Sequence, residues 1–454
     1  MTTSPRLDTL DRIATLAKRR GFVYPSAEIY GSPGAIYDFG PLGTLMRQNL
    51  RREWWRRFVQ ERPDVVGIES AIITKREVLA ASGHEQSFTD PLVECRICHE
   101  RFRADEEIPP APDHAHDLTE PKQFNLMFKT ALGPTEESAA VAYLRPETAQ
   151  GMFTNFKNVL DTARVKVPFG IAQIGKSFRN EITTGKWIFR LREFEIAEIE
   201  YFVRPGSDEE WFQTWLEAWE AFFTDLGLRP KRMRRFEHPP ETLAHYSKRT
   251  VDLQYEFPFG WAELAGVANR TDYDLRQHEA ASGRDLTYFD ESDGSKYHPY
   301  VIEPTVSLER AMLVFLVDAY HEYPGGRAGR QDGREAETVL HLHPRLAPIT
   351  AAVLPLVKRE RMPALAHEIE ADLRRAWSVA YDENGTVGRR YRRYDEIGTP
   401  WCITVDSQTQ EDGTVTVRAR DSMAQDRIPM AALRGYLGEK LEAGAPARTG
   451  APAR

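Results

Sequence analysis

The sequence predicts an α/β (α+β) protein in which an antiparallel β-sheet domain, flanked by helices, precedes a smaller α/β domain. Residues 178–202 hold two strand-like runs around a loop containing Thr183, Thr184 and Gly185, which indicates a long antiparallel hairpin. Residues 324–333 include four glycines, which marks a domain boundary. Beyond it, strand-like and helix-like segments alternate, which is typical of an α/β domain.

The composition limits the classes of protein and partner. Of the 454 residues, 41% are apolar, which is enough for a large core, and the length allows about three domains. A net charge of −8 and a pI near 5.9 argue against binding a polyanion through bulk charge, although a local basic patch remains compatible. Three cysteines are too few for a disulfide framework. No apolar run is long enough for a membrane span or a secretory signal, so we expect a cytoplasmic protein with no membrane partner.

The N-terminal part is expected to contain two helices and a strand. Apolar positions at helical spacing predict a helix over residues 6–20, and a Gly- and Pro-rich loop is expected over residues 31–43. A second amphipathic helix, over residues 42–58, is expected to end before Pro63 and to lead into a strand over residues 65–73.

The middle of the chain contains its least regular segment, residues 95–120. Residues 150–160 and 208–226 have helical spacing. The second of these helices carries an aromatic stripe, which we interpret as core and not as a base-stacking platform. Residues 246–274 alternate apolar and polar positions and predict further strands of the same sheet.

Residues 301–310 predict a strand that turns directly into a helix over residues 310–320. In the second domain, a helix is expected over residues 363–377 and strands over residues 352–357, 378–381, 401–405 and 414–418. Residues 439–454, rich in Ala, Gly, Pro and Arg, are expected to form a disordered tail.

One face of the predicted hairpin is suited to hold a nucleotide together with a small amine. With period-two alternation, Arg190, Arg192, Phe194, Ile196 and Glu198 share a strand face. Guanidinium groups suit phosphate oxygens, an aromatic ring suits a nucleobase, and a buried carboxylate suits an ammonium group. Each residue alone would more often be a solvated surface residue, but the ordered set favours a binding site.

Several motifs resemble a known enzyme family. Phe178-Arg-Asn-Glu181, a loop and the spacing of Arg190, Phe194 and Glu198 resemble motif 2 of class II aminoacyl-tRNA synthetases, and residues 303–310 resemble motif 3. Further stretches resemble the homodimeric type of glycyl-tRNA synthetase, namely residues 81–84, 124–128, 144–151, 260–264 and 388–391. The resemblance extends from about residue 12 to residue 434.

This resemblance implies a class II catalytic domain over residues 1–335, an anticodon-binding domain over residues 336–438 and a tail over residues 439–454. Within the catalytic domain it places motif 1 at about residues 41–73, an irregular insertion at 95–120, motif 2 at about 170–202 and motif 3 at about 301–320. The helix and strand of motif 1 are expected to form the interface of a homodimer. The implied activity is ligation of glycine to tRNA(Gly), with glycine first activated by ATP to glycyl-adenylate and then transferred to the 3′ end of the tRNA.

The resemblance also assigns roles around ATP. Arg179 is expected to bridge the α-phosphate and the substrate carboxylate, and Arg310 to cover adenine and touch the γ-phosphate; these two are the catalytic residues. Arg190 is expected to reach the γ-phosphate, and Glu263 to hold Mg²⁺ through oxygen ligands. The full expected ATP-binding set comprises Arg179, Asn180, Glu181, Phe189, Arg190, Leu191, Arg192, Glu193, Phe194, Glu263, Leu264, Ser307, Leu308, Glu309 and Arg310.

Glycine has no side chain to grip, so its ammonium group is expected to be recognised by Glu147, Glu198 and Glu303, with the Thr305 hydroxyl beside them. The full expected glycine-binding set comprises Arg103, Glu147, Phe194, Glu195, Ile196, Ala197, Glu198, Glu303, Pro304, Thr305, Val306 and Ser307. Two positions depart from the family, because Ser307 stands where a glycine is usual and Ile196 where glutamine is common.

One further group of residues, all arginines, suggests a nucleic acid partner. Arg389, Arg390, Arg392 and Arg393 lie among tyrosines in residues 388–400; such a charge run alone is more often solvated, but the resemblance to an anticodon-binding domain favours tRNA.

Cys95 and Cys98 have the spacing of half a zinc knuckle. His99, His114 and His116 could supply further ligands, but no second pair has the usual spacing. We therefore expect a degenerate, metal-free knuckle.

Two alternative functions are consistent with the sequence. One is a class II synthetase for another amino acid, which an ATP–pyrophosphate exchange panel would identify. The other is a non-catalytic nucleic-acid-binding paralogue, which should have lost the ATP-binding arginines; Arg179, Arg190 and Arg310 all remain.

Overall fold

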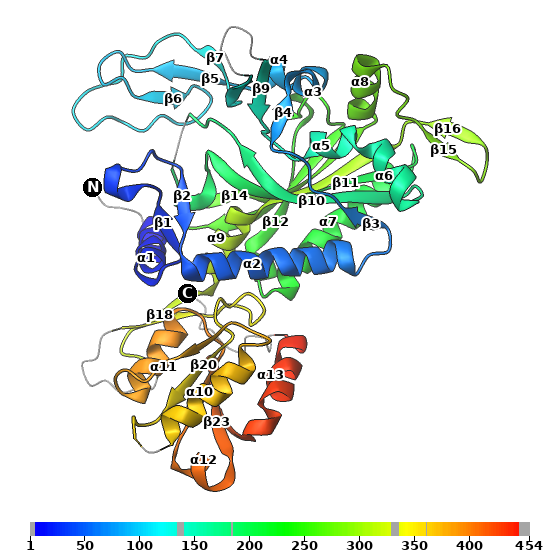
Figure 1. The fold of residues 1–454 in the computed structure, drawn as a ribbon. Helices are drawn as coiled ribbons and strands as arrows, with labels where there is room; N and C mark the ends of the chain where they lie inside the picture. The colour runs from blue at the N-terminus through cyan, green and yellow to red at the C-terminus, as the bar shows by residue number, and fades with distance from the viewer. Residues whose placement is uncertain (1–4, 134–139, 183–184, 328–335, 360, 445–454) are drawn as a thin grey trace.

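The computed structural model describes residues 5–133, 140–182, 185–327, 336–359 and 361–444, which form two domains (Figure 1). The larger, N-terminal domain lies above the smaller one in the view of Figure 1. Helix α2 (Pro41–Trp55) runs along the side of the larger domain that faces the smaller one. Asn49 of α2 donates a hydrogen bond to the Ala347 carbonyl over 2.8 Å, and Glu53 pairs with Arg345 at 3.1 Å. The helix therefore joins the two domains directly.

The larger domain is built on a seven-stranded sheet with the order β12-β13-β14-β17-β11-β10-β3. Neighbouring strands are antiparallel except for β10 and β3. The strands are β3 (Val65–Gly67), β10 (Phe169–Phe178), β11 (Glu193–Val203), β12 (Met233–Glu237), β13 (Arg249–Phe257), β14 (Gly260–Thr271) and β17 (Tyr300–Ser307). The predicted antiparallel sheet is confirmed, including the strands expected within residues 246–274 and 301–310.

The predicted hairpin forms from β10 and β11, but its strands and loop are displaced. The two strands pair along the whole of β10, so residues 179–192 form the connection. Arg190 and Arg192 therefore lie in the loop and not on the strand face, which corrects the expected alignment of five side chains. Thr183 and Thr184 lie outside the described residues.

Helices cover the sheet largely where the sequence predicts them. The helices expected over residues 6–20, 42–58, 208–226 and 310–320 correspond to α1 (Pro5–Arg20), α2 with the π-helical turn η2 (Arg56–Gln60), α7 (Asp208–Asp225) and α9 (Leu308–Ala319). The helix expected over residues 150–160 is interrupted and forms α5 (Ala149–Thr154) and α6 (Phe156–Ala163). Helix α8 (Tyr273–Ser282) packs beside α5.

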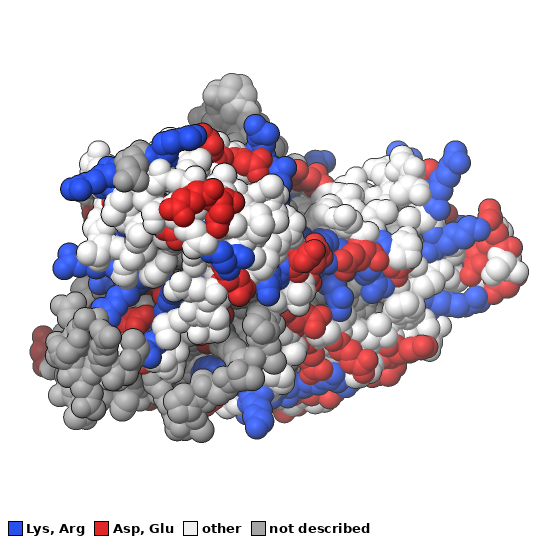
Figure 2. Space-filling view, turned by 90° about the horizontal axis from the view of Figure 1, so that it is seen from below, with Lys and Arg blue, Asp and Glu red and all other residues white. Residues whose placement is uncertain are grey.

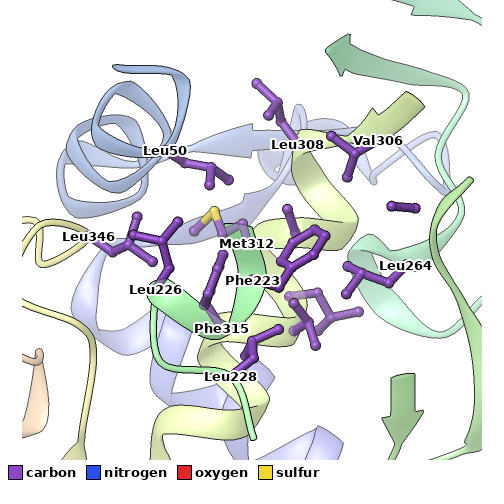
Figure 3. Close-up of a cluster of buried hydrophobic side chains, with 14 of the residues drawn as sticks. Leu50, Phe223, Leu226, Leu228, Leu264, Val306, Leu308, Met312, Phe315 and Leu346 are labelled. Atoms are coloured by element: carbon purple, nitrogen blue, oxygen red, sulfur yellow. The ribbon is translucent and has the colours of Figure 1, made fainter. Parts of the chain in front are cut away.

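The aromatic stripe of α7 belongs to the core, as predicted. The ring of Phe58 lies 6.0 Å from that of Trp215 and 5.0 Å from that of Trp219. Figure 3 shows the adjoining part of this core, where Leu50 of α2 and Phe223 of α7 point toward side chains of α9. The apolar face of α2 is thus buried within its own chain, so only the other faces of this helix are open to the expected homodimer interface.

The expected strand over residues 65–73 is wrong, because its two ends belong to different sheets. β4 (Ile73–Lys75) joins β9 (Ala140–Leu144) and β8 (Lys129–Leu132) in a separate three-stranded sheet. The expected irregular insertion lies in a second small sheet, β6-β5-β7, made of β5 (Thr89–Glu94), β6 (Arg101–Arg103) and β7 (Lys122–Asn125). Helices α3 (Arg76–Ala81) and α4 (His84–Ser87) connect the two small sheets.

The remaining elements of this domain are short. The short elements are β1 (Val23–Pro25), β2 (Tyr37–Phe39), β15 (Tyr288–Asp290), β16 (Ser295–Tyr297), η1 (Glu28–Tyr30), η3 (Trp187–Phe189), η4 (Pro230–Arg232) and η5 (Pro240–Thr242). The loop expected over residues 31–43 contains β2, which pairs with β1, and the start of α2.

The smaller domain has a five-stranded sheet with the order β21-β20-β22-β23-β24. β20 is parallel to β21 and β22, and the remaining pairs are antiparallel. Its elements are β20 (Ala351–Pro355), α10 (Met362–Leu373), β21 (Val379–Tyr381), α11 (Val387–Glu396), β22 (Trp401–Val405), α12 (Ser407–Asp412), β23 (Thr414–Ala419), β24 (Gln425–Pro429), η6 (Met430–Ala432) and α13 (Leu433–Glu442). The predicted α/β domain is confirmed.

Two strands flank the connection between the domains, and helix α13 ends the described part of the chain. β18 (Tyr320–Tyr323) pairs with β19 (Glu337–Leu340), and most of the predicted linker between them lies outside the described residues. Helix α13 includes residues 439–442, so the expected disordered tail begins too early; residues 445–454 lie outside the described part of the chain. Within the described residues, no helix combines the length and the apolar character needed to cross a membrane.

Candidate active site

A pocket lies where β11, β14, β17 and the first turn of α9 meet the loop 179–192. Its lining consists of Arg179, Glu181, Ile188, Phe189, Arg190, Leu191, Phe194, Ile196, Glu263, Thr305, Ser307 and Arg310. Of these, only Ile188 is absent from the set that the sequence predicts. Residues from three separate motifs therefore meet at one place.

Arg179 lies at the end of β10 with its guanidinium held on two sides. Its Nε donates a hydrogen bond to the Pro146 carbonyl over 3.1 Å. The guanidinium carbon lies 5.2 Å from the ring centre of Phe88 and 5.4 Å from that of Phe194. Among the described residues only its Nε bonds a backbone carbonyl, so the terminal nitrogens of this pocket-lining guanidinium are available to an anion.

Arg310 enters the pocket from the first turn of α9. Its Nη1 lies 2.6 Å from Glu263 Oε2, and its Nε donates to the Phe189 carbonyl over 3.2 Å. The Ser307 hydroxyl caps α9 by accepting a hydrogen bond from the Arg310 amide. Burial alone would raise the pKa of Glu263, but the charge and hydrogen bond of Arg310 hold that pKa below its ordinary value.

The loop 179–192 is fixed by its own arginines. Arg192 donates to the carbonyls of Pro33, Gly34 and Glu181, so it ties the loop to the N-terminal segment. Arg190 pairs with Glu106 at 2.7 Å and keeps its side chain at the pocket wall. Arg192 thus acts as a clamp on the loop, whereas Arg190 remains a candidate for phosphate binding.

A cluster of buried carboxylates lies behind the pocket, around the guanidinium of Arg270. Arg270 has 0% exposure and bonds Asp274 at 2.8 and 3.0 Å and Glu303 at 2.7 Å. Glu147 lies 3.8 Å from Arg270 and 3.1 Å from the Nε2 of His84. Two of the three carboxylates expected around the glycine ammonium, Glu147 and Glu303, are therefore arranged around a buried cation to which the sequence analysis assigns no role.

Glu198 connects this cluster to the pocket. It accepts hydrogen bonds from the Thr148 amide over 3.1 Å and from the Thr305 hydroxyl over 2.7 Å. Thr305 itself lines the pocket. The predicted neighbourhood of Glu198, Glu303 and Thr305 is therefore present in the structure.

The carboxyl groups of the cluster differ in their electrostatics. Burial and neighbouring carboxylates raise the pKa of Glu303 well above its ordinary value, against the opposing effect of Arg270. Burial also raises the pKa of Glu200, whose neighbour Glu303 adds to the shift. The pKa of Glu147 is lowered, because His84 and Arg270 together outweigh its burial. Such a mixed cluster carries fewer negative charges than its carboxyl count suggests.

Because side chains alternate along a strand, some of the predicted residues face the pocket and others face away from it. On β11, Glu195 faces away from the pocket, where it pairs with Arg47 at 3.0 Å and its amide donates to Glu309. We therefore propose no direct ligand contact for the predicted residues on the opposite faces or in the core, which are Glu195, Ala197, Leu264, Pro304, Val306, Leu308 and Glu309.

Three other predicted residues have partners outside the pocket lining. Arg103 of β6 pairs with Asp90 at 2.7 Å and with Asp105 at 2.8 Å. The Asn180 amide donates to the Leu126 carbonyl, and Glu193 pairs with Lys176. These contacts position the loop and the insertion around the pocket.

Sequence reasoning missed several members of the site. Arg270, His84, Gln150 and Glu200 have no assigned role in the sequence-based set, yet all four are buried in the carboxylate cluster or beside it. The stretches that contain His84 and Gln150 resemble the family, and this was the available signal. What only the structure shows is their mutual contact.

The predicted tRNA-binding arginines lie on α11 and differ in exposure. Arg389 is exposed and Arg392 is half-buried. Arg390 is 2% exposed and donates to the carbonyls of Pro355 and Asp382, so no tRNA contact is proposed for it. Arg393 pairs with Asp382.

Two of the histidines that the sequence offers complete the ligand count of the knuckle, in place of a second cysteine pair. Cys95, Cys98, His114 and His116 come together so that one ligand atom from each lies within 4.8 Å of the others. The two histidines reach the cysteines through the fold of the insertion, although their spacing in the sequence is unusual. His99 is not part of this group.

Comparison with known sequences agrees with this geometry. Residues 128–319 match the sequence profile described as the tRNA synthetase class II core domain (G, H, P, S and T), and residues 350–440 match that of an anticodon binding domain. The chain is 51% identical to a glycine–tRNA ligase of Corynebacterium efficiens, with 95% of this chain and 98% of the relative covered. It is 52% identical to a glycine–tRNA ligase of Streptomyces coelicolor, with 96% and 99% covered.

The chain belongs to the glycine–tRNA ligase family. Its two domains correspond to the class II catalytic core and the anticodon-binding domain of that family. Among solved structures, a prolyl-tRNA synthetase from Cryptosporidium parvum has a TM-score of 0.65 at 15% identity, covering 97% of this chain and 79% of the other. At that identity the likeness shows a shared fold, and it extends across both domains. The identity of about half of its residues to glycine–tRNA ligases shows that the protein is an aminoacyl-tRNA ligase.

We predict that Glu200→Gln changes the pH dependence of stability. Both carboxyl oxygens of Glu200 lack a hydrogen-bond partner among the described residues, and its pKa is raised in the folded state. The contribution of protonated Glu200 to the free energy of unfolding is therefore fully present below about pH 4.3, the pKa of a glutamate in an unfolded chain. It is lost as pH rises through the raised pKa of Glu200 in the folded protein. Urea unfolding midpoints of the wild type and the variant, measured from acid to alkaline pH, should diverge in favour of the variant as pH rises. Parallel curves would contradict a buried, protonated Glu200.

Proposed function

We propose that this protein activates glycine with ATP to form glycyl-adenylate and then transfers glycine to the 3′ end of tRNA(Gly). The observation that carries the proposal is the meeting of Arg179 and Arg310 in one pocket next to the carboxylate cluster around Arg270. Such a site offers positive charge to phosphates on one side and negative charge to an ammonium group on the other. The identity to glycine–tRNA ligases favours glycine over another amino acid.

In the first step, a glycine carboxylate oxygen attacks the α-phosphorus of ATP and pyrophosphate leaves. No general base is required, because the attacking carboxylate is already ionised. Negative charge on the phosphates would be stabilised by Arg179 and Arg310, with Arg190 also in the pocket lining. Phe194 and Phe189 offer aromatic surfaces for adenine. The retention of these arginines argues against the non-catalytic alternative.

Magnesium fits the oxygen-rich side of this pocket. Glu263 is a hard oxygen ligand of the kind that Mg²⁺ prefers, and one of its oxygens is engaged by Arg310. When bound, Mg²⁺ would neutralise phosphate charge. Asp252 lies near Glu263, and burial together with the charge of Glu263 raises the pKa of Asp252 to about 6.

Selection of glycine follows from what surrounds the ammonium position. Glu198 and Glu303 supply negative charge, and the Thr305 hydroxyl is directed to Glu198 at 2.7 Å. Binding an ammonium cation favours the ionised form of Glu303, whose pKa is raised in the free protein. Ile196 and Thr305 narrow the same wall of the pocket, so a larger amino acid would be excluded by steric clash.

The C-terminal domain is proposed to bind the anticodon region of the tRNA through the exposed side of α11. Arg389 and Arg392 are the members of the predicted set best placed for phosphate contacts. Figure 2 views the molecule from below and shows basic and acidic side chains interspersed over this face. Binding through a few positioned arginines is therefore favoured over binding through bulk charge.

We also propose a cytoplasmic homodimer. The reason is a pair of exposed apolar side chains in η1, because the apolar stripe of α2 is buried. Ile29 and Tyr30 are 88% and 87% exposed. The following residues Pro33 and Gly34 are bonded to Arg192 of the motif 2 loop. Exposed apolar side chains next to a functional loop are typical of an interface.

We predict that Arg179→Ala lowers ATP–pyrophosphate exchange with glycine by about 100- to 1,000-fold, because one charge-stabilising donor is lost. Circular dichroism should show an unchanged fold. The matched control is Arg276→Ala, which removes an exposed arginine of α8 that pairs, among the described residues, with the N-cap residue Asp272 of the same helix. Near wild-type exchange by the Arg179 variant would refute the proposed role.

We predict that the double variant Arg389→Ala, Arg392→Ala weakens tRNA charging but spares ATP–pyrophosphate exchange, because the two steps use different domains. The control with the same loss of charge is Arg374→Ala, Arg375→Ala at the end of α10. Apparent KM for tRNA and exchange rates would be measured side by side. A parallel fall of both activities with the fold intact would mean that α11 does not act through tRNA.

We predict that sedimentation velocity at micromolar concentration shows the wild-type protein as a dimer. The double variant Ile29→Asp, Tyr30→Asp should shift the monomer–dimer equilibrium toward monomer. An aspartate in an apolar interface must be desolvated without a partner, which is unfavourable. Phe289→Asp, which charges an exposed side chain on β15, serves as the control. A wild-type monomer with full exchange activity would contradict the proposal.

A further inference from the structure

The insertion between β5 and β7 has very little core of its own. Its buried apolar residues are Val93, Cys95 and Phe102, with Cys98, Ile108 and Leu118 packed against them. Strand β6 is only three residues long. Such a small cluster stabilises a folded unit weakly, and comparable natural units usually contain a disulfide or a metal ion.

The four candidate ligands of this insertion have the separations of a tetrahedral site. Cys95 Sγ lies 3.6 Å from His114 Nε2, and Cys98 Sγ lies 3.8 Å from His116 Nδ1. Zinc binds thiolate sulfur at about 2.3 Å and imidazole nitrogen at about 2.0–2.1 Å, which in a tetrahedron places the two ligand atoms about 3.6 Å apart. Two independent Cys–His hydrogen bonds would explain each pair alone. They would not require all four atoms to lie within 4.8 Å of one another.

The outer nitrogens of both histidines have the partners that metal-bound histidines use. His114 Nδ1 lies 2.7 Å from the Asp113 carboxylate, and His116 Nε2 lies 3.0 Å from the Pro109 carbonyl. Each of these acceptors requires an N–H, so the lone pair of each ring is on the nitrogen that faces a cysteine. The Ile97 amide donates to Cys95 Sγ over 3.4 Å, which suits a thiolate.

We propose that Cys95, Cys98, His114 and His116 form a structural zinc site. Four protein ligands close the coordination sphere, so the metal has no open position for catalysis. The occupant is a metal that prefers mixed sulfur and nitrogen ligands in tetrahedral geometry, for which Zn²⁺ is the chemical match. The site crosslinks the turn after β5 to the loop before β7.

The site supports residues that approach the active-site pocket. β6 and the turn after it carry Arg103, which pairs with Asp90 at 2.7 Å, and Glu106, which pairs with Arg190 at 2.7 Å. Arg190 lines the pocket. Loss of the metal would loosen the Glu106 contact while leaving Arg179 and Arg310 in place.

The test is metal analysis of the full-length protein, purified without chelator from zinc-supplemented cells. We expect one zinc per chain in the wild type and its loss in the variant Cys95→Ser, His114→Gln. His99→Gln, in the same loop but outside the group, should retain the metal. Asp113→Asn should weaken zinc binding by about 10-fold or more, because the partner of His114 is altered.

A second measurement does not depend on the folding of a variant. After replacement of the metal by Co²⁺ in the wild type, absorption should show the intense d–d bands of a tetrahedral site and thiolate-to-metal charge transfer. Wild-type protein without stoichiometric zinc, or zinc retained by the Cys95, His114 double variant, would overturn the proposal. A cobalt spectrum without charge transfer would also overturn it.

Discussion

The arrangement of the candidate active site depends on the buried guanidinium of Arg270. It is the centre of an ion cluster with Asp274, Glu303 and Glu147, and its charged face lies 3.7 Å from the ring centre of Tyr246. Several buried carboxylates cannot coexist without a compensating cation, because each would be protonated or expelled. Removing one member of such a cluster typically costs about 3–5 kcal/mol, since an unpaired charge stays behind. In the proposed function, recognition of the ammonium group thus rests on a structural cation.

Strand alternation in the main sheet decides which side chains next to this charge cluster face the candidate site. β11 and β17 are neighbours, with Glu198 opposite Thr305, so one face presents the carboxylate and hydroxyl. The opposite face buries Ala197 and Val306 in the core. Glu195 also lies on that side, where it meets Arg47 of α2. The same strands therefore hold the pocket and connect it to the helix between the two domains.

The insertion also places residues around the pocket, but it has almost no apolar core. It packs few apolar side chains, yet it must hold Glu106 against Arg190. A group of four potential ligands supplies a crosslink where a core is lacking. The catalytic core needs no such device, because helices α2, α7 and α9 bury a continuous apolar cluster beside the main sheet.

The sequence by itself determined the fold class, the reaction class and nearly all residues that line the pocket. This was possible because the arginines proposed to bind phosphate lie in short contiguous motifs, and because helices and strands have different hydrophobic periods. It also placed the aromatic stripe of α7 in the core. Its errors arose where one chain segment serves two sheets, as at residues 65–73, or where a loop replaces an expected strand, as at Arg190 and Arg192.

Only the tertiary structure decided which predicted residues face the pocket and which distant residues complete it. Arg270 joins Glu147 and Glu303, and His114 and His116 join Cys95 and Cys98, across spacings that carry no recognisable pattern. It also decided that Arg390 is interior while Arg389 is exposed, although both are arginines on one helix. The physical reason is that sequence motifs report local chemistry. Charge compensation, metal-ligand convergence and burial depend on which segments the fold brings together.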